Sequence, residues 1–167
     1  GETQSEVVAV MEDLARIEDE RGVRIVLALE PEPRSLANDT RELATLRERI
    51  AEHADYVLLR RHLGVGLDAC HAAVEFEDPI EAFERATDFG PLGKIQFSSA
   101  LRLPRPGADP AARDALLAMD EPVYLHQVTG RRGDELVRSR DLPDVRRAVD
   151  ANDPAWSDCD EWRCHFH

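Results

Sequence analysis

Side chains suited to metal binding and acid–base chemistry follow two short apolar runs of the sequence. Val65-Gly66-Leu67 leads into Asp68 with His71 three residues later, and a run at 24–29 ends on Glu30. Buried parallel strands are typically apolar runs, and functional side chains in α/β folds lie just past their carboxyl ends. Carboxylate oxygens and imidazole nitrogens bind Mg²⁺, Mn²⁺ or Zn²⁺. We therefore predict that Glu30, Asp68 and His71 hold a divalent metal.

Further polar side chains follow the other predicted strands. Gln96 and Ser98 come directly after a third apolar run and are predicted to bind a substrate through hydrogen bonds. His165 and His167 alternate at the last predicted strand, so both lie on one of its faces. We predict that His165 assists catalysis, and that His167 and His126 contact the substrate.

His71 and Glu32 are the remaining candidates for proton transfer. Histidine changes charge near neutral pH, so His71 is predicted to act as a general acid or base as well as a ligand. Glu32 lies between Pro31 and Pro33 on a stiff loop, where it would accept a proton or support the metal ligands. The alternative interpretation makes the carboxylates solvated surface groups and the histidines polar residues at the ends of elements.

The composition limits the classes of protein to which the chain can belong. Its 167 residues suit one domain, and 43% hydrophobic with 33% charged residues is typical of a globular protein. A net charge of −13 argues against nucleic acid as a partner. The sequence contains neither an apolar run long enough for a membrane span nor a signal-peptide pattern. Three cysteines without regular spacing favour a reducing compartment, and we predict a cytoplasmic protein.

Apolar strand patterns alternate with helical patterns along the chain. Strands are expected at 23–29, 64–67, 93–97 and 162–167, with a hairpin insertion at about 123–138. Such alternation predicts parallel βαβ units with right-handed crossovers. Four βα units are half of an eight-stranded barrel, so an upstream half or a partner chain would have to close it. The absence of an initiator Met supports the expectation that the sequence is a piece of a longer protein.

Five motifs, in order along the chain, resemble those of one superfamily. They are Leu-Glu-Pro-Glu-Pro at 29–33, Leu-Asp-Ala-Cys-His at 67–71, Lys-Ile-Gln-Phe-Ser-Ser at 94–99, Tyr-Leu-His-Gln at 124–127 and Trp-Arg-Cys-His-Phe-His at 162–167. With them the chain resembles the xylose isomerase-like TIM barrels of sugar-phosphate isomerases and epimerases. Within that superfamily it is similar to the EboE family of metabolite-traffic proteins.

This resemblance implies an α/β fold, with residues 1–167 as the C-terminal half of a (β/α)8 TIM barrel. It also implies a divalent metal on Glu30 and Asp68, with His71 contacting metal or substrate. Two departures matter: Gln96 stands where the epimerases have a histidine, and His165 and His167 stand where they have a second glutamate. The two-carboxylate proton shuttle of that superfamily therefore does not transfer intact.

The leading hypothesis is a metal-dependent sugar or sugar-phosphate isomerase or epimerase that acts on a small polar metabolite. The alternative is a barrel that binds or helps to transport a metabolite without catalysis. Endonuclease activity on abasic DNA is disfavoured by the acidic charge and by the small number of histidine and glutamate ligands. The expected partners are a small molecule and the rest of the barrel, with an oligomer possible, and neither nucleic acid nor membrane.

Overall fold

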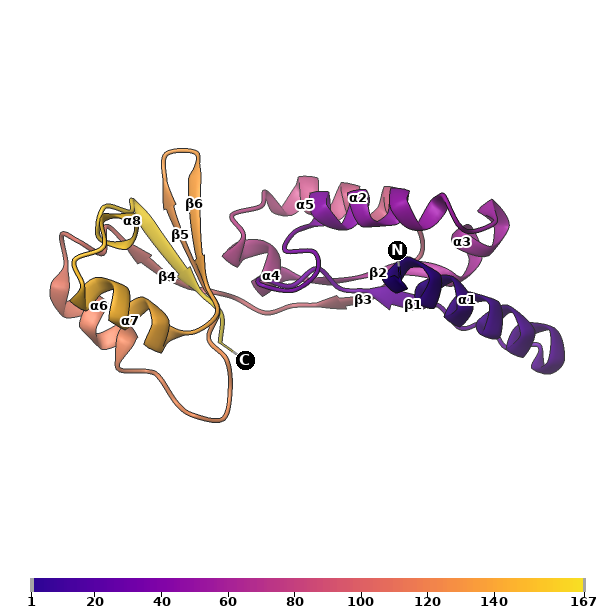
Figure 1. Cartoon of the computed structure of the whole chain (residues 1–167), viewed down its shortest axis with the longest axis horizontal. Helices are drawn as coiled ribbons and strands as arrows, with labels where there is room; N and C mark the ends of the chain where they lie inside the picture. Colours follow the sequence, from indigo (N-terminus) through magenta and orange to yellow (C-terminus); the bar gives the residue numbers. More distant parts are fainter. Residues whose placement is uncertain (1, 167) are drawn as a thin grey trace.

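Two β-sheets, one parallel and one antiparallel, organise residues 2–166, which are the residues that the computed structural model describes. Figure 1 shows an elongated molecule in which the parallel sheet and its helices form one region and the antiparallel sheet forms the other. The chain builds the two regions one after the other and then returns to their junction, where its C-terminal end lies.

The first region contains a three-stranded parallel sheet in the order β1-β2-β3. The middle strand, β2, is buried along its whole length, as its apolar sequence predicts. α2 and α5 lie side by side over the sheet (Figure 1). The elements of this region are α1 (Glu2–Arg21), β1 (Leu27–Leu29), α2 (Thr40–Ala51), α3 (Tyr56–His62), β2 (Leu63–Asp68), α4 (Ala69–Val74), α5 (Pro79–Phe89) and β3 (Leu92–Gln96).

Aspartates begin most of these helices, and the sequence shows why. Asp39, Asp55 and Asp78 each accept a hydrogen bond from a backbone N–H in the first turn of the helix that follows. An aspartate in this position satisfies donors that the helix itself leaves unpaired. One glycine is also required by packing: a Cβ on Gly64 would lie 2.2 Å from the carbonyl oxygen of Pro91. The strands predicted at 64–67 and 93–97 are confirmed as β2 and β3 within one residue at each end.

The second region contains a four-stranded antiparallel sheet in the order β4-β7-β5-β6. Its core is centred on Trp162, whose ring meets that of Trp156 edge to face at a centroid distance of 5.5 Å. Its elements are β4 (Leu101–Pro104), α6 (Pro110–Leu117), β5 (Val128–Arg132), β6 (Glu135–Ser139), α7 (Leu142–Asp150), α8 (Pro154–Ser157) and β7 (Glu161–Cys164).

The prediction of a TIM-barrel half with four parallel βα units is wrong. Only β1, β2 and β3 are parallel, and β7 pairs antiparallel with both β4 and β5. The last strand therefore does not extend the first sheet, and the described residues contain no closed barrel. The expected upstream half of the chain consequently has no barrel to complete here. The alternating pattern was correct for the first three strands and carries no information about the direction of the later ones.

The hairpin lies further along the chain than predicted. Residues 123–127 are not a strand, and the hairpin consists of β5 and β6. It is also not an insertion, because β5 pairs with β7 and is an inner strand of the sheet. β4 was missed because it is a short edge strand that ends on Pro104, in a stretch whose prolines suggested a loop.

The two regions meet where α4 and the turn after it face β5, β6 and β7. Arg138 Nε donates to the buried Glu75 at 2.7 Å, and Arg163 Nη1 donates to the carbonyl oxygen of Ala73 at 2.8 Å. The guanidinium groups of Arg131 and Arg163 lie 4.4 and 4.2 Å from the centre of the Phe76 ring. This contact brings the ends of β2 and β7 together.

In the described part of the chain, every helix is too short or too polar to cross a bilayer.

Candidate functional site

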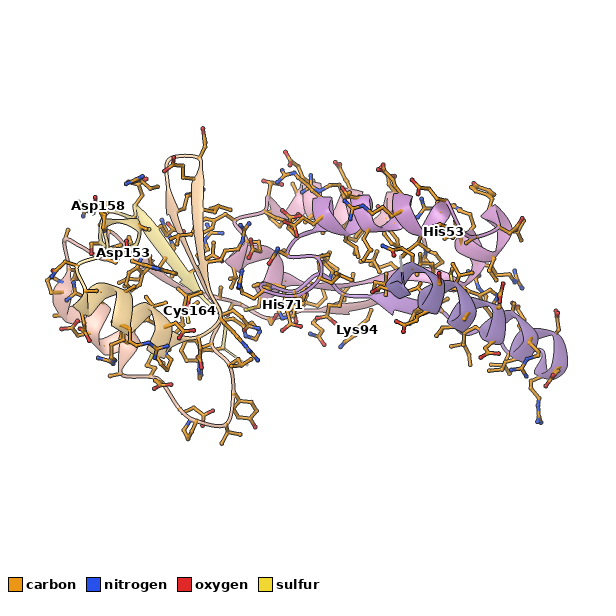
Figure 2. All side chains as sticks on the ribbon, in the orientation of Figure 1. His53, His71, Lys94, Asp153, Asp158 and Cys164 are labelled. Carbon is orange, nitrogen blue, oxygen red and sulfur yellow. The ribbon has the colours of Figure 1, made fainter. Side chains whose placement is uncertain are left out.

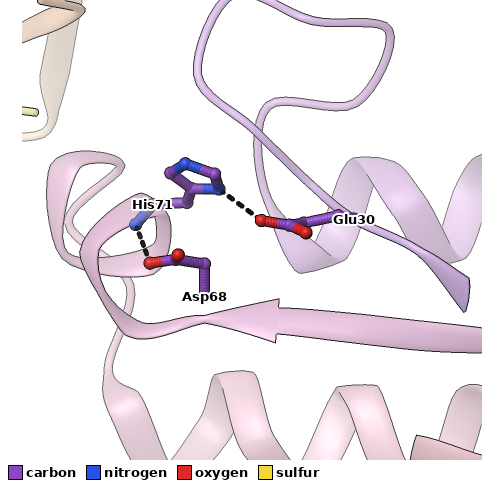
Figure 3. Close-up of side chains that lie close together, drawn as sticks. All are labelled: Glu30, Asp68 and His71. Carbon is purple, nitrogen blue, oxygen red and sulfur yellow. Dashed lines mark hydrogen bonds and ion pairs between the residues drawn. The ribbon is translucent and has the colours of Figure 1, made fainter. Parts of the chain in front are cut away.

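Glu30, Asp68 and His71 come together at the carboxyl ends of β1 and β2 (Figure 3). Leu29 pairs with Val65 in parallel register, so the residues that follow both strands emerge at the same edge of the sheet. The Nδ1 atom of His71 lies 3.2 Å from Oε1 of Glu30. One ligand atom from each of the three residues lies within 4.8 Å of the others. The predicted metal ligands are thus gathered into one cluster.

Asp68 is fixed from several sides. Its Oδ1 atom accepts hydrogen bonds from the backbone N–H of Cys70 at 2.7 Å and of His71 at 3.3 Å, and from the hydroxyl of Ser98 at 2.5 Å. Its Oδ2 atom accepts a hydrogen bond from the amide of Gln96. Burial alone raises the pKa of Asp68, but the hydrogen bonds from Ser98 and Gln96 and the nearby His71 and Cys70 outweigh it, so the pKa lies below its ordinary value. Asp68 is therefore an immobile anion at neutral pH.

The structure places Gln96 and Ser98 beside Asp68. Both were predicted to bind substrate, and in the structure both side chains donate to Asp68 from the end of β3 and the residues after it. Gln96 also lines the neighbouring pocket, whereas the Ser98 hydroxyl accepts a hydrogen bond from the backbone N–H of Cys70. The two side chains therefore orient the Asp68 carboxylate.

His165 reaches the cluster from the antiparallel region. Its ring Nε2 lies 3.2 Å from Nε2 of His71, and its backbone N–H donates to the carbonyl oxygen of Gln127 at 2.9 Å. Figure 2 shows His71 at the junction of the two regions. Because one nitrogen must donate and the other accept, the two imidazole rings must carry complementary protons at this contact. His71 thus lies between Glu30, on its Nδ1 side, and His165, on its Nε2 side.

A pocket of about 490 Å³ opens beside Glu30, His71 and His165. Polar groups from both regions form one part of its wall, and the segment before β5 forms the rest. The lining residues are Glu30, Glu32, His71, Gln96, Val123, Tyr124, Leu125, Gln127 and His165. Four of the predicted catalytic or metal-binding residues therefore face one cavity, whose size suits a small-molecule ligand (roughly 300–1,000 Å³).

Gln127 is a pocket residue that the sequence analysis did not single out. Its side chain is buried, with a residue exposure of 5%, and its Nε2 donates to Oε1 of Glu32 at 2.9 Å. The carboxylate requires a donor, which fixes the amide with Nε2 toward Glu32. The other amide atom, Oε1, is buried and accepts no hydrogen bond from any described residue. The signal in the sequence that could have identified Gln127 as a site residue is its place in the Tyr-Leu-His-Gln motif.

His126, a predicted substrate contact, is not among the residues that line this pocket. His126 is buried beside Phe166, with ring centroids 4.5 Å apart, and its Nδ1 lies 3.5 Å from Oδ1 of Asp141. His167 lies outside the described residues. The direct contact of either residue with a substrate stays a prediction.

The cysteines near the site are packed thiols. Burial raises the pKa of Cys70 to about 11, and burial likewise raises the pKa of Cys164. Both thiols are therefore protonated at neutral pH, and a thiol is a poor nucleophile and metal ligand until it loses its proton. Cys70 therefore fills space beside Asp68 and takes no part in the chemistry of the site.

The donors in the cluster fit a divalent metal. Neighbouring ligands of an ion bound at about 2.1 Å in tetrahedral or octahedral geometry lie roughly 3.0–3.5 Å apart, and the 3.2 Å separation of Glu30 Oε1 and His71 Nδ1 falls in that range. Two carboxylates and one imidazole match the preferences of Mn²⁺ and Zn²⁺, and the carboxylates also suit Mg²⁺. The hydrogen bonds that orient Asp68 are those expected around a metal ligand.

The chain was compared with known protein families, curated proteins and solved structures. No known protein family matches it, and neither a curated protein nor a solved structure does.

Proposed function

We propose that Glu30, Asp68 and His71 bind a divalent metal, and that the pocket beside them binds a small polar metabolite on which the protein moves a proton, as isomerases and epimerases do. The observation that carries the proposal is the cluster itself: ligand atoms of three side chains lie within 4.8 Å of one another, and two of these residues, Glu30 and His71, line a partly polar pocket. A carboxylate with a perturbed pKa beside a pocket, as Asp68 is, is typical of functional sites.

The polar wall favours a ligand with hydroxyl and carbonyl groups. The buried Oε1 of Gln127 is an acceptor in need of a donor, which a hydroxyl group supplies. A metal on the cluster would polarise a carbonyl or hydroxyl oxygen of the ligand. The substrate class we infer is a small sugar, sugar phosphate or related hydroxy-carbonyl compound.

Glu32 and His165 supply the proton transfer in this proposal. Glu32 lies in the pocket wall, held by Gln127, and its carboxylate takes a proton from the carbon beside the carbonyl group. His165 donates a proton to the oxygen that gains negative charge and takes one back from the neighbouring hydroxyl group. With a metal on Nδ1, His71 would keep its proton on Nε2 and hold the His165 ring in place.

The test measures metal content and proton exchange in the same set of variants. The protein is stripped with chelator, reloaded with Mn²⁺, dialysed and analysed for bound metal. It is then incubated with a panel of aldoses and ketoses in heavy water, and exchange of the hydrogen beside the carbonyl is followed by NMR. We expect about one bound Mn²⁺ at this cluster, lost in a Glu30→Gln, Asp68→Asn double variant. Glu32→Gln should retain the metal and slow exchange by about 10²–10⁴-fold.

Asp88→Asn is the matched control, because Asp88 is an exposed carboxylate on α5, away from the cluster. It should keep both metal and exchange. Equal metal content in the wild type and the double variant would refute the metal site. Without exchange, saturable binding of a sugar to the metal-loaded protein would favour the second function, a metabolite-binding protein without catalysis, which the same pocket supports.

The same proposal includes a cytoplasmic location and a small molecule as the partner. The three cysteines are free and buried, which suits a reducing compartment. The net charge of −13 argues against nucleic acid as the ligand of the pocket.

A further inference from the structure

A second group of metal-ligating side chains lies in the antiparallel region. Asp120 follows α6, His126 precedes β5, and Asp141 begins α7. One ligand atom from each residue lies within 4.8 Å of the others. Asp120 is exposed, Asp141 is half-buried and His126 is buried, so the group is open to solvent on one side only.

His126 points an unsatisfied atom at this group. The residue is 4% exposed, and its buried Nδ1 makes no hydrogen bond with any described residue. The nearest carboxylate oxygen, Oδ1 of Asp141, is 3.5 Å away, whereas a hydrogen bond to nitrogen is about 2.7–3.2 Å long. A buried polar atom without a partner is destabilising, so the geometry calls for a partner between the ring and the carboxylates.

The 3.5 Å separation matches two ligands of one metal ion. Ligands about 2.1 Å from a tetrahedrally coordinated Zn²⁺ lie roughly 3.4 Å apart. Asp141 is already held in place, because its Oδ1 accepts hydrogen bonds from the backbone N–H of His126 at 3.0 Å and of Leu142 at 2.9 Å. Two carboxylates also balance the charge of a divalent cation, and their pairing with an imidazole is suited to Zn²⁺ or Mn²⁺.

The position of the group suggests what a cation there does. Asp120 and His126 flank the segment 121–125, which includes Val123, Tyr124 and Leu125 of the pocket wall. These three side chains are 72%, 64% and 43% exposed, so packing holds them weakly. A cation bound by both ends of the segment and by Asp141 would close it into a loop anchored on α7.

We propose that Asp120, His126 and Asp141 form a second divalent-cation site, of the Zn²⁺ or Mn²⁺ class, that fixes segment 121–125. Cation binding there is independent of the function proposed above, whereas its consequence for the pocket rests on that function. His126 is a ligand of this structural site, which differs from the substrate contact predicted from the sequence.

The test uses Zn²⁺ as the probe and counts bound ions by calorimetry and metal analysis. The wild-type chain should bind two equivalents. The Glu30→Gln, Asp68→Asn variant should bind one, and adding Asp120→Asn to it should abolish the remaining one. Asp120 is exposed, so this substitution leaves the fold intact. Asp134→Asn, at an exposed aspartate in the β5–β6 turn, is the matched control and should keep the ion.

A second readout follows the segment itself. Chymotrypsin cleaves after exposed tyrosines, and Zn²⁺ should slow cleavage after Tyr124 at least fivefold without changing cleavage after Tyr56, which is exposed on α3. The protection should disappear in Asp120→Asn and persist in Glu30→Gln, Asp68→Asn.

The outcomes separate the two proposed sites. Loss of one ion in the Asp120→Asn variant, with protection of Tyr124 lost, supports the second site even when the first site fails its own test. Zn²⁺ binding in Asp120→Asn that equals binding in Asp134→Asn would overturn the second site. Zn²⁺ binding without protection of Tyr124 would overturn its role in fixing the segment.

Discussion

The parallel and antiparallel regions contribute to the site in different ways. In the parallel region, Glu30 and Asp68 stand at adjacent strand ends, and the direction of the strands alone brings them to the same edge. In the antiparallel region, the carboxyl end of one strand lies beside the amino end of its neighbour, so an edge collects residues that precede one strand and follow the next. Its contributions, His165 and Gln127, flank the strands that face the first region.

The difference teaches that metal binding and substrate binding can have separate structural origins. The three proposed metal ligands all belong to the parallel region, whereas about half of the residues that line the pocket belong to the antiparallel one. A substitution can therefore damage one property and spare the other, and three predictions use this.

The largest expected effect comes from the core of the antiparallel region. Trp162 is fully buried, so Trp162→Ala should lower the free energy of unfolding by about 3–5 kcal/mol, measured by denaturant titration. Phe97→Ala removes an aromatic ring that is 92% exposed and should change stability by less than about 0.5 kcal/mol. If the Trp162→Ala variant still binds Mn²⁺ with wild-type affinity, the parallel region alone suffices to form the metal site. Loss of that affinity would make the two regions one cooperative unit.

A smaller effect is expected from the residue that orients Asp68. Gln96→Leu removes a hydrogen bond to the carboxylate and should weaken Mn²⁺ binding by about 10–100-fold, measured by calorimetry. Lys94→Gln, at an exposed position of the same strand, is the control and should leave the affinity unchanged. Unchanged affinity in Gln96→Leu would show that Asp68 needs no support from β3.

The subtlest difference lies in two buried carboxyl groups, one on each side of α4. The pKa of Asp68 is lowered, because hydrogen bonds outweigh burial, so its contribution to stability is complete above about pH 4 and is lost as the pH falls through the folded-state pKa. Burial raises the pKa of Glu75 despite its pairing with Arg138, so its contribution is complete below about pH 4 and is lost as the pH rises through the folded-state pKa.

NMR titration of the carboxyl carbons checks both directions. Asp68 should titrate below an ordinary aspartate and Glu75 above an ordinary glutamate. Ser98→Ala should raise the pKa of Asp68 alone, and Arg138→Met should raise that of Glu75 alone, because each removes one stabilising partner of the anion. An Asp68 that titrates at or above the ordinary aspartate range would contradict the hydrogen-bonded site.

Local patterns in the sequence were sufficient for much of the first region. The β2 run is apolar because the strand is buried, and Asp39 and Asp78 precede their helices because aspartate satisfies the first backbone N–H groups. The same local logic failed at 123–127, where alternating apolar residues suggested a strand. These residues pair with no described strand. β5 forms because it pairs with β7, and that pairing begins only at Val128.

The sequence by itself determined which residues could bind a metal and which strand ends would carry them, because residue type and local periodicity are local properties. Only the tertiary structure decided that β7 runs antiparallel, since strand direction depends on how distant segments pack. That decision excluded the barrel and still brought His165 to His71 and Gln127 to Glu32. Residues so far apart in sequence meet only through the contact between the two regions, which no local pattern encodes.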